Sequence, residues 1–274
     1  MIAAQFAEAR QSFRRVLRRP GTAILIVLSL GFAIGLNVAL FSVLDRFLLT
    51  PLPVPSPETL YEIRYRDLHP AAIPSHPTLP YPDYLEAAKS LSSFSGIAFE
   101  RRQGALLTIG GRQTSAYAHL VSRNYFTVLG VPIRHGPGLD RPGQSVVISH
   151  GFWMRELGGA PNVTGQALLL NGASFTIAAI AHPEFRGTER LVPIDLWIPV
   201  DDWLEQLPQF RKTFNRRDVN DGHIWSRVRA GVTRNQARAE VEAFAGDMAR
   251  EWPQTNRQLT GYLGRSSTNG TPAS

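Results

Sequence analysis

The residue types that act as catalysts are present in this sequence, but their spacing fits no known catalytic motif. Ser149 and His150 offer a hydroxyl and an imidazole, the pair that serves as nucleophile and base in hydrolases. Because adjacent residues cannot easily turn these groups toward each other, we interpret Ser149 as a helix N-cap and His150 as an exposed first-turn residue. The sequence has no Gly-x-Ser-x-Gly, His-Glu-x-x-His or EF-hand loop, so we predict no catalytic residues and no enzyme.

Two further pairs of residues offer imidazole and carboxylate groups, which are metal ligands. They are His182 with Glu184 and Asp221 with His223. Pro183 interrupts the first pair and both pairs fall in expected loops, so no single face presents them together, and we predict no metal site. We also predict no cofactor, since residues 158–165 lack the Gly-Lys-Ser/Thr of a phosphate-binding loop. The absence of cysteine excludes disulfide bonds and thiolate ligands.

Other polar and aromatic residues have structural interpretations. Asp201 and Asp202 precede Trp203 and favour a helix N-terminus, where acidic side chains interact with the helix dipole. The Tyr-Pro-Asp-Tyr segment at 81–84 starts a helix and is expected to order a surface loop. Five tryptophans are expected to anchor the core: Trp153, Trp197, Trp203, Trp225 and Trp252.

The formal net charge of +7 does not indicate nucleic-acid binding. Five arginines precede residue 20, and the rest of the chain has 24 basic and 21 acidic residues, which is close to balance. Arginine supplies almost all of the positive charge, as coding bias in a GC-rich genome would produce. We therefore predict no nucleic-acid partner.

Residues 21–44 form a run of 24 residues without a charge. About 20 apolar helical residues cross the hydrocarbon core of a bilayer, so this run predicts a transmembrane helix. The alternative is a cleaved signal peptide, but its apolar region would be shorter, and residues 41–46 offer no Ala-x-Ala cleavage site. The preceding arginines predict a cytoplasmic N-terminus, a single pass through the plasma (inner) membrane and a periplasmic location for the bulk of the chain.

Residues 1–20 have the pattern of a basic amphipathic segment on the cytoplasmic surface of the membrane. Phe6, Phe13 and Leu17 recur at helical spacing, opposite the arginine row of residues 10, 14 and 18. The lipid bilayer is therefore the first expected partner. A flexible basic tail is the alternative.

Small residues recur every four positions within the expected span, at Gly31, Gly35 and Ala39. Such a stripe lets a second helix approach closely, and the amide of Asn37 favours a hydrogen-bonding partner inside the membrane. These four helix-packing candidates are the only site residues that we predict.

The rest of the chain predicts a proline-rich connector at 45–57 and an α+β domain at 58–257, with mixed sheets. Strands are expected at 60–65, 94–99, 105–109, 114–121, 145–148, 167–170, 175–181, 196–200 and 224–229. Helices are expected from residue 81, at 124–129, at 151–157 and from Thr233 to Pro253. In the helix from residue 81, Leu85, Ala88 and Leu91 are expected to face inward.

The strongest local signals are a turn and a cap. Asn171-Gly172 predicts a two-residue hairpin turn. Thr233 and Gln236 predict a capping box at the start of the last helix. Residues 258–274 are polar and predict a disordered tail.

Many short motifs follow one another in an order that resembles one family. They include residues 41–46, Tyr-Pro-Asp-Tyr at 81–84, Val-Ile-Ser-His-Gly-Phe-Trp at 147–153, Asp-Leu-Trp-Ile-Pro at 195–199 and Gly-Val-Thr at 231–233. The order resembles the MacB-like periplasmic core domain of MacB/FtsX-type ABC transporter permeases. It looks most similar to the large permeases of soil bacteria such as Acidobacteria, and extends to about residue 257.

The resemblance implies a two-lobed extracytoplasmic domain without catalytic, cofactor or metal residues of its own. It implies mechanotransmission, in which an ABC ATPase in trans moves the membrane helices and these move the periplasmic domain. The implied partners are that ATPase, other permease helices, and a periplasmic adaptor or substrate. Family members continue into further spans, so we expect a fragment that does not transport alone. The alternative is an independent single-pass, membrane-anchored binding or scaffold protein.

Overall fold

The computed structural model describes residues 20–48, 54–68, 78–139, 143–189 and 192–265, and the chain divides into two compact units at residues 50 and 51. The first unit contains helix α2 (Pro20–Leu48), along which large apolar side chains such as Phe32 and Phe41 are exposed. No helix among the described residues has the length and apolarity required of a membrane-crossing segment. The amphipathic segment expected before Pro20 lies outside the described residues.

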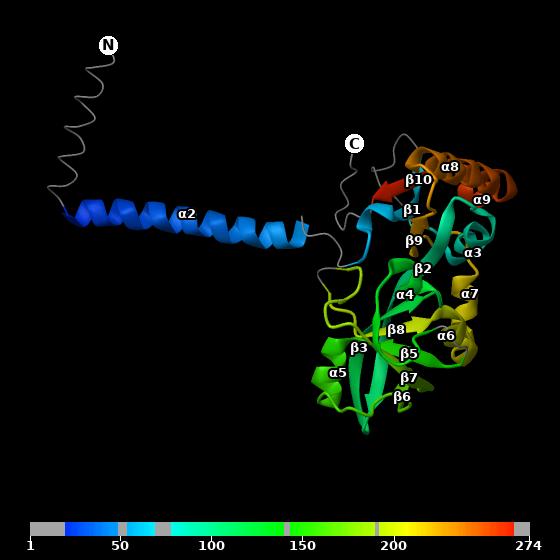
Figure 1. Ribbon diagram of the computed structural model, residues 1–274, viewed down its shortest axis with the longest axis horizontal. Helices are drawn as coiled ribbons and strands as arrows, with labels where there is room; N and C mark the ends of the chain where they lie inside the picture. Colours follow the sequence, from blue (N-terminus) through cyan, green and yellow to red (C-terminus); the bar gives the residue numbers. More distant parts are fainter. Residues whose placement is uncertain (1–19, 49–53, 69–77, 140–142, 190–191, 266–274) are drawn as a thin grey trace, which may run out of the picture. The chain divides into compact units, whose positions relative to one another are not determined.

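The second unit is built on one mixed sheet (Figure 1). Its strands are β1 (Leu60–Asp67), β2 (Phe94–Ile109), β3 (Arg112–Val121), β4 (Ile133–His135), β5 (Ser145–Ile148), β6 (Ala167–Leu170), β7 (Ala173–Ala181), β8 (Leu196–Pro199), β9 (His223–Val228) and β10 (Leu259–Arg265). Their order is β10-β1-β9-β2-β3-β8-β5-β7-β4, and β6 pairs with β2 and β7. Among these pairs, β3 with β8 and β5 with β7 are parallel and the others antiparallel. The prediction of an α+β domain with a mixed sheet is confirmed, whereas the two expected lobes share one continuous sheet within one compact unit.

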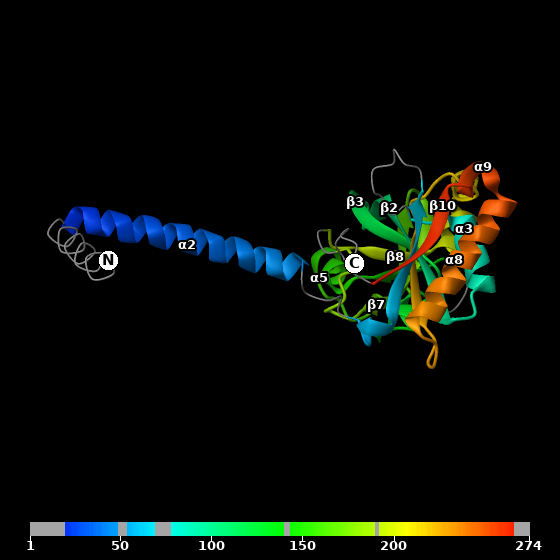
Figure 2. The same cartoon turned by 90° about the horizontal axis from the view of Figure 1, so that it is seen from above.

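Helices flank this sheet. They are α3 (Tyr81–Ser90), α4 (Tyr125–Leu129), α5 (His150–Leu157), α6 (Val200–Gln206), α7 (Arg211–Phe214), α8 (Arg234–Glu251) and α9 (Pro253–Asn256), with the 3₁₀ turns η1 (Pro57–Thr59) and η2 (Pro208–Phe210). Figure 1 shows α8 and α9 beside β10 and β1, and α5 toward the opposite end of the unit, beside β3. Seen from above, α3 and α8 lie on the same side of the sheet (Figure 2).

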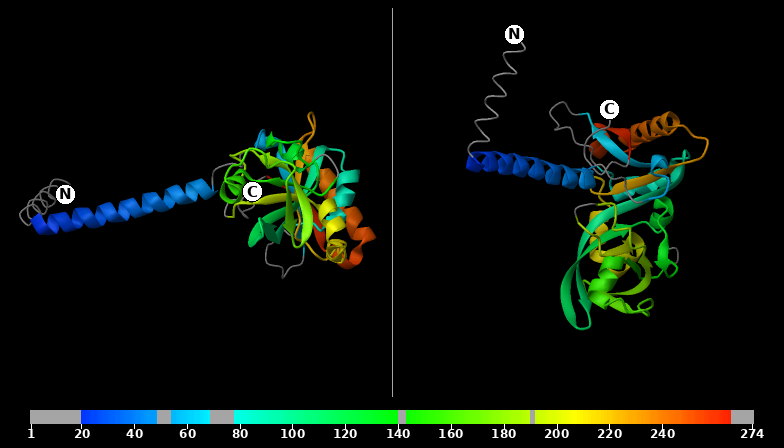
Figure 3. Two further views of the ribbon diagram at one scale, coloured as in Figure 1. Left: turned by 90° about the horizontal axis from the view of Figure 1, so that it is seen from below. Right: turned by 60° about the vertical axis from the view of Figure 1, so that its left-hand side comes forward.

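Side chains alternate along the strands between two buried faces, because successive strand residues point to opposite sides. The first face lies under α3 and α8 and is apolar, with Ile63, Phe99 and Leu120 fully buried. The second face lies under α4 and contains apolar residues such as Val121, but it also carries buried charged residues. These are Glu62, Glu100 and His119. The long β2–β3 hairpin, visible in Figure 3, connects the central part of the sheet to the strands around β8.

Most of the expected elements are present, with shifted ends. The expected strands at 94–99 and 105–109 are one strand, β2. Asn171 and Gly172 both have positive φ, 50° and 82°, as the predicted hairpin turn requires. Thr233 and Gln236 form the predicted capping box of α8.

Three expectations at the end of the unit that holds β1 and β10 are wrong. Leu85 and Ala88 of α3 are exposed, and Tyr84 and Ala87 face the core with Leu91 instead. Asp83 does not belong to a surface loop, because it is fully buried. It accepts hydrogen bonds from Tyr65 (2.5 Å) and Asn256 (2.8 Å), and it forms an ion pair with Arg217. These contacts turn the helix so that Asp83 faces inward.

The third correction concerns the expected disordered tail at 258–274. Residues 259–265 form β10, which pairs with β1 along seven positions. Gly261 explains the polar, glycine-containing sequence of this strand, because a Cβ there would lie 2.3 Å from the carbonyl oxygen of Val241 in α8. A side chain at this position would push the helix away from the strand.

Candidate functional site

Arg227 of β9 fastens the end of the connector to the sheet. Its guanidinium donates five hydrogen bonds, which is the full number of its N–H groups. The acceptors are the carbonyl oxygens of Pro55 (3.2 Å), Ser56 (3.1 Å), Val128 (2.8 Å) and Leu129 (3.0 Å) and the hydroxyl of Thr59 (2.7 Å). We call Arg227 with these five residues the connector clamp.

Local backbone geometry supplies the acceptors of the connector clamp. Gly130 ends α4 in the left-handed conformation, with φ of 71°, and the last carbonyls of a helix have no partner within it. A cation at this end also interacts favourably with the helix dipole. On the connector side, Ser56 has φ of 48° and is the N-cap of η1, which turns its carbonyl toward Arg227. Burial lowers the pKa of Arg227 and the charge of Glu58 opposes this shift.

The strand that enters the domain lies beside the last described strand. β1 follows directly after the connector clamp, and it is antiparallel to β10, so Tyr61 near its start pairs with Arg265 at the end of β10. On its other side β1 pairs with β9, where Leu60 lies opposite Arg227. The connector, β1, β10 and the clamp arginine therefore meet at one edge of the sheet.

A carboxylate at the centre of the second face, Glu100 of β2, is almost completely buried. It accepts hydrogen bonds from the hydroxyls of Tyr125 and Thr188 and from Nε1 of Trp225 (3.1 Å). Burial alone would raise the pKa of Glu100, but the charge and hydrogen bond of His119, the charge of His223 and the hydroxyl of Thr188 together outweigh burial and lower the pKa to about 2. Glu100 is thus an anion at every physiological pH.

His119 of β3 lies between two carboxylates. Its Nδ1 is 2.9 Å from Oε1 of Glu100, and its Nε2 is 3.4 Å from Oε1 of Glu189, in the segment between β7 and β8. Burial lowers the pKa of His119, but Glu100 and then Glu189 outweigh it and raise the pKa to about 9. On the open side, Nε of Arg102 lies 3.0 Å from Glu189. We call Glu100, His119 and Glu189 the ionic cluster.

A second buried ion pair lies on the same face, one strand further toward the edge. Glu62 of β1 is 2.7 Å from Nδ1 of His223 in β9 and also contacts Arg64. Burial lowers the pKa of His223, but the hydrogen bond and the charge of Glu62 outweigh burial and raise it, with a smaller contribution from Glu100 and an opposing one from Arg64. Burial likewise raises the pKa of Glu62, yet His223 and Arg64 lower it overall.

These shifts predict how stability depends on pH. The raised pKa of His223 means that its contribution is complete below the unfolded value of about 6.5 and is lost as the pH rises through the folded value. The lowered pKa of Glu62 means that its contribution is present above about 4.5 and is lost as the pH falls further. As the pH rises from 6 to 9, we expect the unfolding free energy of wild type to fall relative to that of His223→Gln, measured by urea titration. A difference that does not change with pH contradicts the assignment, and His182→Gln is the matched control.

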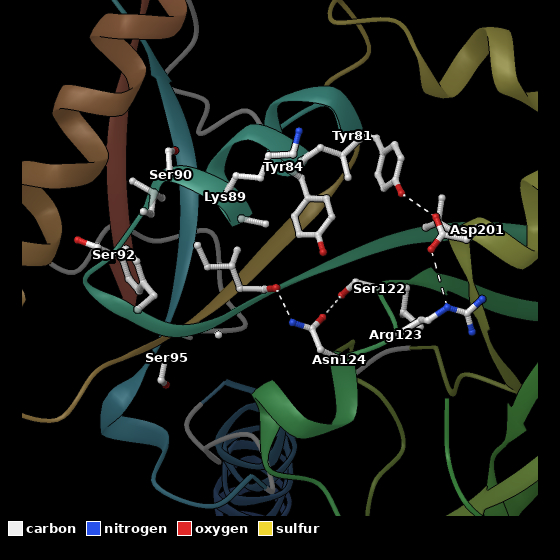
Figure 4. Close-up of a pocket in the computed structure, with 18 of the residues that line it drawn as sticks. Tyr81, Tyr84, Lys89, Ser90, Ser92, Ser95, Ser122, Arg123, Asn124 and Asp201 are labelled. Carbon is white, nitrogen blue, oxygen red and sulfur yellow. Dashed lines mark hydrogen bonds and ion pairs between the residues drawn. The ribbon is translucent and has the colours of Figure 1, made fainter. Parts of the chain in front are cut away.

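A polar cleft of about 690 Å³ lies between α3, the start of β2 and the turn before α4. Figure 4 shows Tyr81 pointing toward Asp201 (3.3 Å), and Asp201 in turn toward Arg123 (3.8 Å). On its floor, Ser122 donates to Asn124 (2.7 Å). The floor groups therefore bind one another, while Lys89 and Arg229 add positive charge to the rim.

The structure separates the residues for which the sequence offered chemistry. Ser149 is the N-cap of α5, accepting from the amide of Phe152, as predicted. Of the residues considered as metal ligands, Asp221 pairs with Arg101 (2.7 Å), His223 pairs with Glu62, and Nδ1 of His182 accepts from the amide of Glu184 (3.4 Å). Trp197, Trp203 and Trp225 are core residues as expected, whereas the prediction is wrong for Trp252, which is 41% exposed under the guanidinium of Arg217.

The helix-packing candidates lie on α2. Gly31, Gly35, Asn37 and Ala39 are all exposed, and among the described residues a Cβ built on either glycine would meet nothing within 4 Å apart from its chain neighbours and the backbone of its own helix. The side-chain amide of Asn37 donates to the carbonyl of Ala33 in the same helix (2.9 Å). The role of the stripe stays a prediction.

The sequence reading missed the connector clamp and the ionic cluster. One signal was available: Glu100 and His119 each stand inside an apolar strand, at positions that alternation assigns to a buried face. Arg227 had no such signal, since an arginine at a strand end is usually exposed, and its acceptors are backbone carbonyls from two distant segments.

Comparisons with known proteins agree with this fold. Residues 23–244 match the family model of the MacB-like periplasmic core domain, and the chain belongs to this family. The resemblance stated from the motifs is therefore confirmed. No curated protein gives a significant match.

Three solved structures share the fold. The periplasmic region of MacB from Actinobacillus actinomycetemcomitans is 15% identical over 82% of this chain and 92% of its own, with a TM-score of 0.55. A domain of a putative permease from Porphyromonas gingivalis is 15% identical over 77% of this chain and 92% of its own, with a TM-score of 0.58. The extracellular domain of the noncanonical ABC-type transporter YknZ from Gram-positive bacteria is 11% identical over 74% and 99%, with a TM-score of 0.51. The protein is thus an extracytoplasmic domain of the kind found in MacB/FtsX-like ABC transporter permeases.

Proposed function

We propose that this chain provides the membrane anchor and the extracytoplasmic domain of an ABC transporter permease of the mechanotransmission type, without catalysis of its own. The observation that carries this proposal is the connector clamp. A domain moved from the membrane needs a stiff joint where the connector reaches it, and Arg227 of β9 binds the connector residues Pro55 and Ser56, Thr59 of η1 and the end of α4. A domain that only binds a ligand has no need of such a joint.

The proposed anchor is the uncharged run of residues 21–44, crossing the plasma (inner) membrane once with the N-terminus in the cytoplasm. The absence of charge, the preceding arginines and the exposed apolar side chains of α2 support it. The bulk of the chain is then periplasmic, as in the family.

The proposed partners are an ABC ATPase in trans, other permease helices, and a periplasmic adaptor or substrate. Gly31, Gly35 and Ala39 leave room along one stripe of α2 for a neighbouring helix, and Asn37 adds a polar group beside it. We assign the polar cleft of Figure 4 to an adaptor or substrate. Transport depends on these partners.

Crosslinking and purification of the full chain from native membranes tests the proposal. We expect a cytoplasmic ATPase or another permease subunit to be recovered with wild type. Gly31→Leu with Gly35→Leu is expected to reduce that recovery severalfold, because leucine side chains keep a second helix at a distance. Val38→Leu, a change of similar chemistry in the same helix, is the matched control.

Recovery of periplasmic proteins alone favours the scaffold alternative and contradicts the proposal. Equal recovery with the leucine variant and with wild type removes the role assigned to the stripe. A chain found only in the soluble fraction contradicts the membrane anchor.

A further inference from the structure

A groove of about 690 Å³ lies where α3, the end of α7 and the junction of α8 with α9 meet. Figure 1 shows α9, α3 and α7 one below another along the same side of the second unit. The groove is lined by Pro82 and Leu85 of α3, by Asn215 and Arg217, and by residues 251–255. Among the described residues, Leu85 alone also lines the polar cleft, so the groove is a separate recess.

Trp252 presents an aromatic ring to this groove. Helix α8 ends at Glu251, because Pro253 has no N–H donor and its ring would clash with the preceding turn. The backbone of Trp252 therefore leaves the helical region, with φ of −125° and ψ of 61°, and the residue is 41% exposed. The guanidinium of Arg217, 4.1 Å from the centre of the ring, covers one face and is itself held by the buried Asp83. The ring is thus fixed in place, and much of its remaining surface is accessible.

Three polar side chains of the lining have no hydrogen-bond or ion-pair partner among the described residues. They are the exposed side chains of Asn215, Glu251 and Gln254. Glu251 is the last residue of α8, where a negative charge interacts unfavourably with the helix dipole. Neither its position nor its contacts in the described part of the chain give this carboxylate a role in the fold. Groups that a protein holds at a cost to its stability are commonly retained for function.

The polar groups of the groove limit the ligands that fit it. A proline-rich or apolar peptide would cover the carboxylate and the two amides without supplying the partners that they need, and burial of unpaired polar groups is unfavourable. A cationic ligand would lie close to Arg217, and an anionic ligand close to Glu251. A neutral ligand avoids both repulsions. Its hydroxyl groups can donate to Glu251 and bind both amides, while an apolar face packs on Trp252.

We propose that this groove binds a neutral oligosaccharide. A pyranose ring has C–H groups on its face and hydroxyl groups around its edge, which matches an accessible indole ring beside a carboxylate and two amides. In this site one sugar ring lies on Trp252, and Glu251, Asn215 and Gln254 bind its hydroxyls. The volume of the groove falls within the range of about 300–1,000 Å³ that is usual for small-molecule sites. An extracytoplasmic domain of this family meets such glycans in the cell envelope.

Isothermal titration calorimetry of the full chain with maltotriose, cellotriose and chitotriose tests the proposal, in a detergent without a sugar headgroup. We expect at least one of these trisaccharides to bind with one ligand per chain and to change the tryptophan fluorescence. Trp252→Ala is expected to weaken that binding roughly tenfold or more, because the surface under the sugar ring is lost. Glu251→Ala is expected to weaken it by a similar factor without lowering the unfolding free energy, since the charge that it removes is unfavourable at the end of α8. This second variant decides the question if Trp252→Ala fails to fold.

Tyr117→Ala and Glu242→Ala are the matched controls and should bind the trisaccharide as wild type does. Tyr117 is an aromatic residue that is 61% exposed outside the groove, and Glu242 is an exposed carboxylate of α8. The proposal is overturned if no trisaccharide binds at concentrations up to about 10 mM, or if Glu251→Ala or folded Trp252→Ala binds as tightly as wild type. It is equally overturned if either control weakens binding as much, or if decaproline binds more tightly than every trisaccharide. None of these outcomes depends on whether an ATPase is recovered with the chain.

Discussion

Replacing Arg227 with alanine is expected to release residues 54–59 from the domain. Five hydrogen bonds are lost at once, and the carbonyls of Val128 and Leu129 at the end of α4 lose their cationic donor. Hydrogen bonds from a charged group contribute more than neutral ones, but the connector carbonyls regain water, so we expect the unfolding free energy to fall by roughly 2–4 kcal/mol. Hydrogen–deuterium exchange of the full chain should rise most at 54–60 and at 125–130.

Two comparison variants make this prediction specific to the connector clamp. Arg229→Ala removes the next arginine along the chain, whose guanidinium donates to the carbonyl of Phe94 (3.2 Å), and should change stability by less than about 1 kcal/mol. Arg227→Lys keeps the charge but cannot reach acceptors in two directions, so it should restore less than half of the loss. Unchanged exchange at 54–60 in Arg227→Ala would show that the joint is held by other contacts.

Replacing Glu100 with glutamine is expected to have the largest effect on stability of any single change on the second face. Tyr125, Thr188, Trp225 and His119 all present donors to this carboxylate. The amide group of glutamine would face some of these donors, and His119 would lose its nearest negative charge. Breaking a buried ion pair by removing one partner costs about 3–5 kcal/mol, and we expect a loss of that size in urea titrations at pH 7.

Glu184→Gln provides the matched control for this prediction. Glu184 is exposed in the segment after β7, so its neutralisation should change the unfolding free energy by less than about 0.5 kcal/mol. A loss below 1 kcal/mol in Glu100→Gln would mean that Glu100 contributes little as a buried anion.

Local signals predicted the elements well because they act over a few residues. The positive φ at Asn171 and Gly172 and the capping box of Thr233 depend only on neighbouring atoms, and both are present. The predictions of the ends of β2 and of the inward face of α3 were wrong, because residues distant in the sequence determine both. Arg217 and Asn256, far along the chain, bind Asp83 and so set which side of α3 is buried.

The candidate site was beyond the sequence for the same reason. The partners of Arg227 come from the connector and from α4, and those of Glu100 come from α4, β9 and the segment after β7. Sequence motifs relate residues that lie close together in the sequence, such as His182 and Glu184. The residues of the ionic cluster are far apart in the sequence, so no motif of this kind relates them. Even β10 was hidden, since close packing against α8 selects glycine at position 261, which a sequence reading takes for flexibility.

The pairing of Tyr61 with Arg265 determines how the domain responds to a pull. If the two strand ends move together, β1 and β10 travel as one ribbon, and the load enters the third strand through the guanidinium of Arg227. If the ends move apart, the force acts first on the backbone hydrogen bonds at the Tyr61–Arg265 end of the β1–β10 pair, and these bonds break one after another. The sheet therefore resists deformation when the start of β1 and the end of β10 move together. It yields more easily when these two strand ends are pulled apart.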